Sequence, residues 1–267
     1  MKRIVAAITL FTCLSGEVIS QDDSPYQTSL VVDGSIIAAG VGLNAYGLTL
    51  LKDKEGLTQE EIRTQTKEDV NRFDRFSAGW DSEAADNHSD YPFYGSFVAP
   101  LALLLNDNVK SNAGQVFVLY VETMAITGAL FTVTNGYFPR NRPLTYSPDV
   151  SDSEKMRGNA QSSLYSGHTA ASASAAFFAA KVFHDFNPDS PARPYVWAAA
   201  AAVPATVGYL RLRAGKHFLS DKILSYTLGA AAGILVPQLH KKNNNRDISL
   251  LPVSGRDYNG ASLTYTF

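Results

Sequence analysis

Apolar residues are concentrated in six stretches of the chain, and none of the six shows the strict alternation of a half-buried strand. The stretches are rich in Ala, Gly, Leu and Val and contain few runs of β-branched residues, which favours helices. We therefore predict six helices that pack as a bundle. The six stretches cover residues 34–51, 91–105, 113–134, 169–180, 194–210 and 223–239.

A charged segment at residues 52–90 separates the first two stretches. Within it, Thr58 followed by Glu61 has the spacing of a capping box, so a short solvated helix is predicted to begin there. Asp74 and Asp90 lie in the same segment and are interpreted as part of a solvated face, with a substrate entrance as the alternative. Polar loops are predicted at residues 135–165 and 185–193.

The chain changes character after Pro237. A polar run at residues 241–245 is followed by Ile248–Val253 and Ala261–Phe267, which look extended, and in the second of them apolar and polar side chains alternate. This alternation is typical of a strand, so a short β hairpin is predicted at the C-terminus. The predicted fold is all-α, a six-helix bundle followed by this hairpin.

The first twenty residues are typical of a secretory signal peptide. Lys2 and Arg3 precede a short apolar run, Ile4–Leu14, and small and polar residues follow, so we predict cleavage after Ser20. The run is too short to cross about 30 Å of hydrocarbon, which favours a signal over a membrane-spanning helix. The predicted divisions are 1–20 for the signal, 21–242 for the helical domain with its insert at 52–90, and 243–267 for the tail.

Composition excludes several classes of protein. The chain has 267 residues, of which 45% are hydrophobic and 18% charged, and its formal net charge is −2. These values exclude intrinsic disorder and a nucleic-acid binder that relies on bulk positive charge. The single cysteine, Cys13, excludes a disulfide scaffold and a cysteine-ligated zinc site. Whether the helices span a membrane stays open, because only 113–134 has a comfortable length and it contains Glu122.

Three clusters of polar residues lie at the ends of predicted helices. The first contains Arg140 and Arg142, the second is Tyr165–Thr169, and the third runs from Arg211 through His217 to Asp221. Hydrolysis of a phosphate ester needs a nucleophile, an acid for the leaving oxygen, and donors for the phosphate oxygens. If the loops converge on one face of the bundle, the three clusters supply all of these groups.

Each group in the clusters has a predicted role. His217 and Asp221 are four residues apart, so on one helix they share a face, and Asp221 is predicted to fix the tautomer of His217. The other ring nitrogen of His217 is then free to attack phosphorus, and His168 is the candidate general acid. Arg142 and Arg211 are predicted to hold phosphate oxygens in bidentate fashion.

Ser166 and Gly167 complete the candidate site. Ser166 offers a hydroxyl, and the Gly167 N–H lies near a helix N-terminus, which is a natural anion site. Taken singly, these residues are better explained as interfacial histidines and solvated helix ends; taken as an ordered set, they favour a phosphatase. The other histidines, His88, His184 and His240, are predicted to be solvated surface or loop residues, and Glu122 is predicted to make a hydrogen bond within the bundle.

The ordered set resembles the motifs of the type 2 phosphatidic acid phosphatase and vanadium haloperoxidase superfamily. That pattern is Lys-x6-Arg-Pro, then Pro-Ser-Gly-His, then Ser-Arg-x5-His-x3-Asp, and the resemblance covers about 110–225. It implies a phospho-histidine intermediate with His217 as the nucleophile, and no metal ion or other cofactor.

The chain departs from the family pattern at three positions. Asn135 replaces the lysine, Tyr165 replaces a proline and Leu210 replaces a serine. The change at Asn135 removes one cationic phosphate contact, for which Arg140 or Lys216 could substitute.

The resemblance and the apolar helices together predict a phosphatase of the cell envelope. The predicted enzyme hydrolyses phosphomonoester or pyrophosphate groups, with a phosphorylated lipid as the substrate, and is membrane-associated and faces the periplasm. Three alternatives stay open: a soluble periplasmic acid phosphatase of broad specificity, a haloperoxidase that holds vanadate, and a non-catalytic envelope protein that keeps the pocket. No nucleic-acid partner is expected, and the oligomeric state is not predicted.

Overall fold

The structure is a computed structural model that describes residues 24–242, 248–254 and 259–265. The predicted signal peptide, residues 1–20, lies outside the described residues. The described chain is mostly helical, which confirms the all-α class. Six of the described helices have 14 residues or more: α2 (Leu30–Lys52), α4 (Glu83–Ser96), α6 (Ala113–Tyr137), α8 (Gly167–Phe186), α9 (Arg193–Arg213) and α10 (Leu219–Leu239).

Shorter helices join the long ones. The apolar stretch 91–105 is divided between the end of α4 and α5 (Val98–Leu103), because Pro100 has no N–H to donate to the carbonyl of Ser96. The other short elements are α3 (Gln59–Thr64), α7 (Asp152–Lys155) and the 3₁₀ turns η1 (Lys67–Asp69), η2 (Arg75–Ser77), η3 (Lys110–Asn112), η4 (Pro143–Tyr146) and η5 (Gly158–Gln161).

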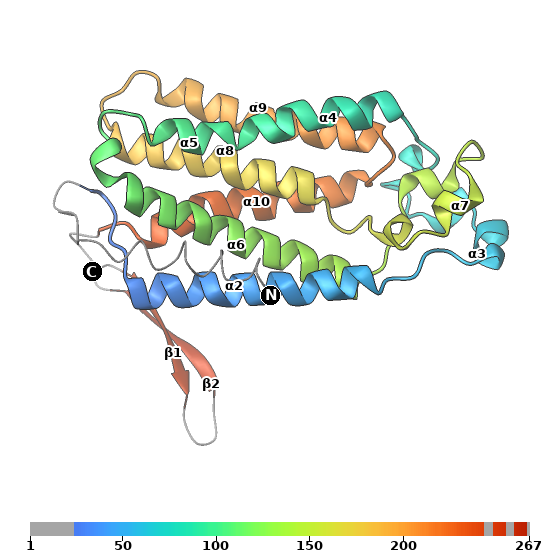
Figure 1. Ribbon diagram of the computed structural model, residues 1–267, viewed down its shortest axis with the longest axis horizontal. Helices are drawn as coiled ribbons and strands as arrows, with labels where there is room; N and C mark the ends of the chain where they lie inside the picture. The colour runs from blue at the N-terminus through green and yellow to red at the C-terminus, as the bar shows by residue number, and fades with distance from the viewer. Residues whose placement is uncertain (1–23, 243–247, 255–258, 266–267) are drawn as a thin grey trace, which may run out of the picture.

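Helix α8 is the centre of the bundle, and α4, α6, α9 and α10 pack around it (Figure 1). Small residues allow this close packing. A Cβ atom at Gly229 or Gly233 of α10 would collide with backbone carbonyls of α8, and the Ser174 hydroxyl donates a 3.0 Å hydrogen bond to the Gly229 carbonyl. The small residues of α8 therefore let α10 pack directly against its backbone.

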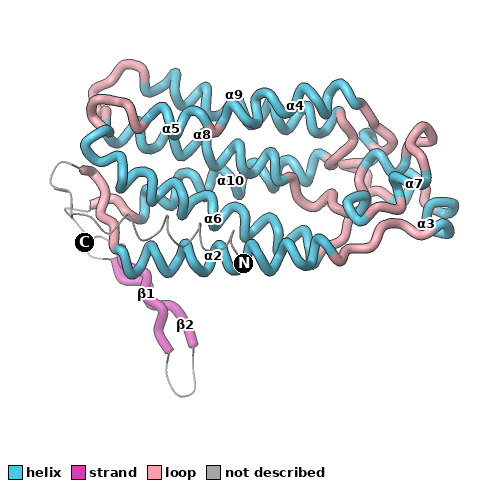
Figure 2. The backbone as a smooth tube through the Cα atoms, in the orientation of Figure 1, coloured by secondary structure: helices cyan, strands magenta, loops and turns pink. Residues whose placement is uncertain are grey.

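Helix α2 packs along α6 at the edge of the bundle (Figure 2). Gly40 faces Ala125 and Gly47 faces Thr132, so the two backbones approach closely. The outer face of α2 is apolar and exposed, with Leu30 and Val31 among its residues.

Three of the described helices are long and apolar enough to cross a membrane: α2, the segment Lys110–Tyr137 that contains α6, and α10. The sequence prediction of a single comfortable span was wrong, because α2 and α10 extend beyond their apolar stretches to 23 and 21 residues. These three helices indicate association with a membrane.

The insert at 52–90 folds over one end of the bundle, on the same side as α7 (Figure 1). The predicted capping box is confirmed, since Thr58 caps α3 and the Glu61 side chain accepts from the Thr58 N–H. Val70 and Ala78 of the insert pack against Phe218, which immediately precedes α10. The insert is therefore part of the packed structure at this end.

Two strands follow the bundle. Strand β1 (Ile248–Ser254) pairs antiparallel with β2 (Asn259–Tyr265), with Ile248 opposite Tyr265. Figure 1 shows the pair extending away from the helices, at the end of the bundle opposite the insert.

Candidate active site

The three predicted clusters lie at the end of the bundle that the insert covers. His168 is the second residue of α8, Arg211 lies in the last turn of α9, and His217 precedes α10 by two residues. Gly215, between the last two, has a φ of +66°, and a Cβ atom there would collide with the Trp80 carbonyl of the insert. The insert thus closes against the loop that carries His217.

His217 is buried and held in one tautomer. Its Nδ1 atom lies 2.6 Å from the carbonyl oxygen of Ser163, which can only accept, so Nδ1 carries the proton and Nε2 carries the lone pair. Burial lowers the pKa of His217 well below its usual value, and the charges of Lys222 and Arg142 lower it further. The residue is therefore a neutral imidazole whose Nε2 carries a lone pair.

Asp221 does not hold the ring of His217, contrary to the sequence prediction. Its carboxylate accepts hydrogen bonds from the Ser163 hydroxyl (2.6 Å) and the Phe218 N–H (2.9 Å). The spacing argument required both residues on one helix, but α10 begins at Leu219, so His217 lies outside it. Asp221 instead supports His217 indirectly, by fixing the residue whose carbonyl binds Nδ1.

His168 is half-buried beside α4. Its Nε2 atom lies 3.6 Å from a carboxylate oxygen of Asp90, and its ring contacts Phe93 with the centroids 4.2 Å apart. Burial lowers the pKa of His168 to about 4, and the charges of Arg211 and Lys222 contribute in the same direction. His168 is therefore neutral at pH 7 when no anion is bound.

Arg142 and Arg211 have donors that none of the residues in the described part of the chain satisfies. Among the described residues, the buried Nε atom of each has no hydrogen-bond partner. Burial lowers the pKa of Arg142 to about 10, and the positive charge of Arg211 contributes to this shift. The two guanidinium groups are therefore close enough to repel each other. Because buried donors are normally paired, two orphaned N–H groups on neighbouring cations indicate a site for an anion.

Ser166 and Gly167 form the start of α8. The Ser166 hydroxyl caps the helix, accepting from the Thr169 N–H at 3.3 Å, and the Ser166 N–H donates to the Ser225 hydroxyl at 2.8 Å. Gly167 packs against Phe131, whose ring a Cβ atom would meet at 3.0 Å. Both residues therefore position the N-terminus of α8, where backbone N–H groups favour an anion.

Arg140 does not substitute for the missing lysine. Its guanidinium pairs with Asp74 at 2.7 Å and with Asp221, and it stacks on Phe218 with Cζ 4.7 Å from the ring centroid. Asp74 is completely buried and also accepts from Ser220, so its interpretation as a solvated residue of the insert was wrong. Arg140 is held in the structure by these two carboxylates.

A cation beside Asn135 comes from the segment that follows the neighbouring helix, α2. Lys54, just after α2, donates from Nζ to the Asn135 carbonyl (2.7 Å) and side-chain oxygen (3.3 Å). Burial lowers the pKa of Lys54 to about 8, with a further contribution from Arg142. Sequence analysis missed Lys54, since it lies 81 residues from Asn135 and belongs to no motif.

Two more charged residues escaped the sequence analysis. Asp86 of α4 pairs with Arg211 and, at 3.0 Å, with Lys216, so Lys216 lies beside Arg211. Lys222 is buried with Nζ 3.5 Å from the Thr169 hydroxyl, and its charge lowers the pKa of both His168 and His217. Its position next to Asp221 was the signal that could have identified it.

One hollow lies beside the insert, and another lies at the middle of α8. The first, of about 290 Å³, is lined by Trp80, Asp81 and Arg213 with their neighbours, and none of the predicted site residues lines it. The other is an apolar groove of about 370 Å³ between α4, α8 and α9. Ala176 in its wall lies eight residues beyond His168, which is about 12 Å along α8.

Comparison with known proteins identifies the family. Residues 116–245 match the PAP2 superfamily. This part of the chain belongs to the PAP2 superfamily. The match includes all three clusters and confirms the resemblance to the type 2 phosphatidic acid phosphatases. Because the PAP2 superfamily generally contains phosphatases, it supports a phosphoric ester hydrolase. No curated protein and no solved structure matches the chain.

Proposed function

We propose that this protein is a metal-independent phosphatase that acts on lipid-linked phosphate through a phospho-histidine intermediate. The observation that carries the proposal is the pair of buried, unpaired Nε–H groups of Arg142 and Arg211 beside the neutral imidazole of His217. Cationic donors and an uncharged nucleophile are what attack on a phosphate anion requires.

The proposed reaction has two steps. First, His217 Nε2 attacks phosphorus, the bond to the leaving oxygen breaks, and protonated His168 gives its proton to that oxygen. Then neutral His168 takes a proton from water, whose oxygen attacks phosphorus and breaks the P–N bond, releasing inorganic phosphate. The hydrogen bond from Nδ1 to the Ser163 carbonyl keeps His217 oriented in both steps.

His168 becomes an acid only when substrate binds. In the free protein the charges of Arg211, Lys222 and Arg142 add to burial and hold its pKa near 4. A phosphate dianion placed among these cations neutralises them and stabilises the imidazolium, which raises the pKa of His168. Substrate binding therefore provides the protonated form that the leaving group needs.

Asp86 holds the site closed in the absence of substrate. Its carboxylate pairs with Arg211 and Lys216, and Asp90 and Phe93 follow at helical spacing on the same face of α4, against His168. We infer that the substrate phosphate displaces the Asp86 carboxylate from these two cations. Lys54 would then supply to the phosphate, beside Arg142, the positive charge that the family lysine provides and that Asn135 lacks.

The apolar groove supports a lipid as the substrate. It runs between α4 and α9 over the alanines of α8, and its lining is almost entirely apolar, so the hydrocarbon tail of a substrate can lie in it. The three candidate membrane spans favour a lipid substrate over the soluble phosphatase alternative. In this proposal the six long helices are the family's catalytic bundle, and the site faces the periplasm.

The intermediate can be trapped directly. The detergent-solubilised protein is mixed with ³²P-labelled p-nitrophenyl phosphate, whose good leaving group needs no acid, and the label on the protein is tested for acid lability. We expect label on the wild type, more label on His168→Ala because breakdown of the intermediate is slowed, and none on His217→Asn.

The exposed His88 provides a matched control, and His88→Ala is expected to label like the wild type. Label on His217→Asn, or its hydrolysis at the wild-type rate, would show that His217 is not the nucleophile. The non-catalytic and haloperoxidase alternatives predict no label on any variant.

The lipid preference has its own test. Ala199→Phe fills the groove, whereas Ala198→Phe adds the same ring to the neighbouring exposed position, which does not line it. Displacing about two CH₂ groups of a bound tail costs roughly 1.6 kcal/mol, which is a loss of about tenfold in kcat/KM. We expect this loss for long-chain phosphatidate with Ala199→Phe only, and no loss for p-nitrophenyl phosphate; equal effects on both substrates would contradict a lipid in the groove.

A further inference from the structure

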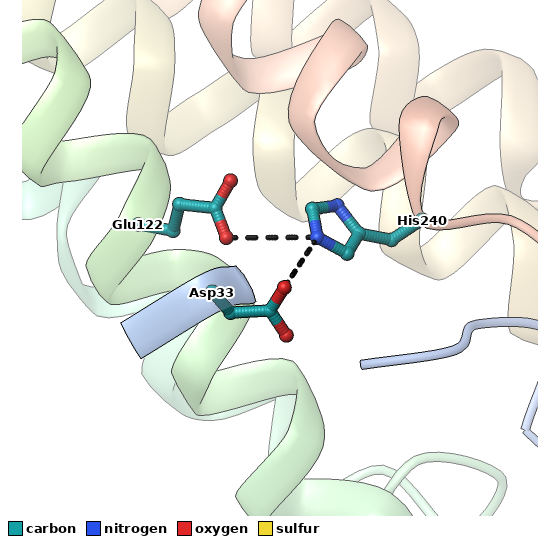
Figure 3. Close-up of side chains that lie close together, drawn as sticks. All are labelled: Asp33, Glu122 and His240. Atoms are coloured by element: carbon teal, nitrogen blue, oxygen red, sulfur yellow. Dashed lines mark hydrogen bonds and ion pairs between the residues drawn. The ribbon is translucent and has the colours of Figure 1, made fainter. Parts of the chain in front are cut away.

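A second cluster of ionisable residues lies at the other end of the bundle (Figure 3). Asp33 is in the first turn of α2, Glu122 is in α6, and His240 caps the C-terminus of α10. Glu122 is fifteen residues before Tyr137, the end of α6 at the catalytic site, which is about 22 Å along the helix. The cluster is therefore separate from the phosphatase site.

The sequence interpretation of two of these residues was wrong. His240 was expected to be solvated, but its side chain is only 13% exposed and points between two carboxylates (Figure 3). Glu122 was expected to make a hydrogen bond within the bundle, but among the described residues its buried Oε2 atom has no hydrogen-bond partner.

Three acceptor atoms converge in this cluster. His240 Nε2 lies 3.1 Å from Asp33 Oδ1 and 3.6 Å from Glu122 Oε2, and all three atoms lie within 4.8 Å of one another. His240 Nδ1 is 2.8 Å from the Val236 carbonyl, which can only accept, so Nδ1 carries the proton in the neutral ring. Nε2 faces the two carboxylates, an arrangement that a positive charge between the three atoms would stabilise.

The distances suit a metal ion. Ligands at about 2.0–2.1 Å from a tetrahedral zinc ion are about 3.3 Å apart, between the two separations measured from Nε2. The outer contacts are also those of a metal site: the Val236 carbonyl orients the imidazole, and the Ser29 N–H donates to Asp33 Oδ2 at 2.8 Å.

We propose that Asp33, Glu122 and His240 bind a divalent transition-metal ion, with Zn²⁺ as the best match to one imidazole and two carboxylates. Water would complete its coordination. An imidazole ligand disfavours Mg²⁺ and Ca²⁺, which prefer oxygen donors. Because Asp33 and Glu122 lie in two of the candidate membrane spans and His240 directly follows the third, the ion would clamp α2, α6 and α10 together.

The site can be tested on the full chain, purified in detergent without chelator. Zinc content is measured by mass spectrometry after dialysis, and Co²⁺ replacement is followed by its visible absorption, which reports tetrahedral coordination. We expect about one ion per chain, and a dissociation constant at least 100-fold weaker in Glu122→Gln and His240→Ala. The control His88→Ala should keep the wild-type affinity.

Glu122→Gln separates loss of metal from loss of fold. The glutamine amide can donate to His240 Nε2, so this variant satisfies the cluster without an ion and should stay folded. We expect a chelator to lower the Tm of the wild type and to leave the Tm of Glu122→Gln unchanged. Wild-type protein with no stoichiometric metal and no Co²⁺ spectrum, or Glu122→Gln with undiminished affinity, would overturn the proposal and leave the phosphatase assignment untouched.

Discussion

The two ends of the bundle hold similar histidines in opposite surroundings. At the catalytic end, His217 Nδ1 bonds to the Ser163 carbonyl, and at the far end His240 Nδ1 bonds to the Val236 carbonyl. Both rings therefore anchor Nδ1 on a backbone carbonyl and leave Nε2 for other partners. His217 lies in the field of Lys222, Arg142 and Arg211, whereas His240 faces Asp33 and Glu122.

In the two proposals, the neighbours of the imidazole, and not its tautomer, select its ligand. A lone pair among cations favours an incoming phosphorus atom with its negative oxygens, and a lone pair among carboxylates favours a metal ion. The catalytic end also contains buried carboxylates, Asp74 and Asp221, but Arg140 pairs with both. Among the described residues, no arginine is paired with Asp33 or Glu122.

The largest expected effect comes from removing Arg140, which makes the catalytic end resemble the far end. Arg140→Met leaves two completely buried carboxylates without their counter-charge, and we expect the free energy of unfolding to fall by about 3–5 kcal/mol. Denaturant unfolding in detergent measures this. Lys110→Met, which breaks an exposed pair with Asp107, should cost less than about 1 kcal/mol. A stable Arg140→Met with a raised KM would instead restore Arg140 as a phosphate ligand.

The two ends should respond to ligands of opposite charge. At 100 times its dissociation constant, a ligand stabilises the folded state by about 2.7 kcal/mol, or roughly 5–10 °C in Tm for a chain of this size. We expect inorganic phosphate to stabilise the wild type and Glu122→Gln but not Arg211→Met. Zinc should stabilise the wild type and Arg211→Met but not Glu122→Gln. A variant that loses both responses would show that the ends are coupled.

The pH dependence of hydrolysis should follow His168. Because kcat/KM reports the free enzyme and His168 must be protonated, kcat/KM should fall about tenfold for each unit of pH above its pKa of about 4. Asp86 raises the pKa of His168, so Asp86→Asn should move this fall to lower pH. The measurement is a pH profile corrected for ionisation of the substrate. A profile that is flat from pH 5 to 8, or a shift to higher pH in Asp86→Asn, would refute the role of His168.

A smaller effect is expected for Lys54. Losing one charged hydrogen-bond donor beside the phosphate should raise KM about tenfold in Lys54→Met, and the loss of charge above a pKa of about 8 should weaken binding in the wild type over the same pH range. Lys52→Met removes a neighbouring exposed lysine and should leave KM unchanged. Equal KM values for the two variants would exclude Lys54 from the site.

The smallest effect is expected for the C-terminal strands. Because β1 and β2 extend away from the helices (Figure 1), deletion of 248–267 should leave kcat/KM and zinc content within about twofold of the wild type. Activity and metal content of the truncated chain measure this. Failure of the truncated chain to fold would show that the strands support the bundle.

Much of the fold followed from local pattern. The apolar stretches form helices because helix propensity depends on residues within a few turns of one another. The capping box at Thr58 forms because its partner, Glu61, is three residues away. The clusters at His168 and His217 were recognised for the same reason, since each motif is contiguous in sequence. The prediction failed where a helix boundary shifted by two residues, which separated His217 from Asp221.

The sequence by itself determined the helical class, the PAP2 superfamily and the three clusters of candidate catalytic residues, because these depend on residues close together in the chain. Only the tertiary structure decided which distant groups complete the two sites. Lys54 meets Asn135 across 81 residues, Arg211 meets Asp86 across 125, and His240 meets Asp33 across 207. Such pairs form only when the helices pack closely. Small residues such as Gly40 and Gly229 allow this close packing, because a Cβ atom at either position would crowd the neighbouring helix.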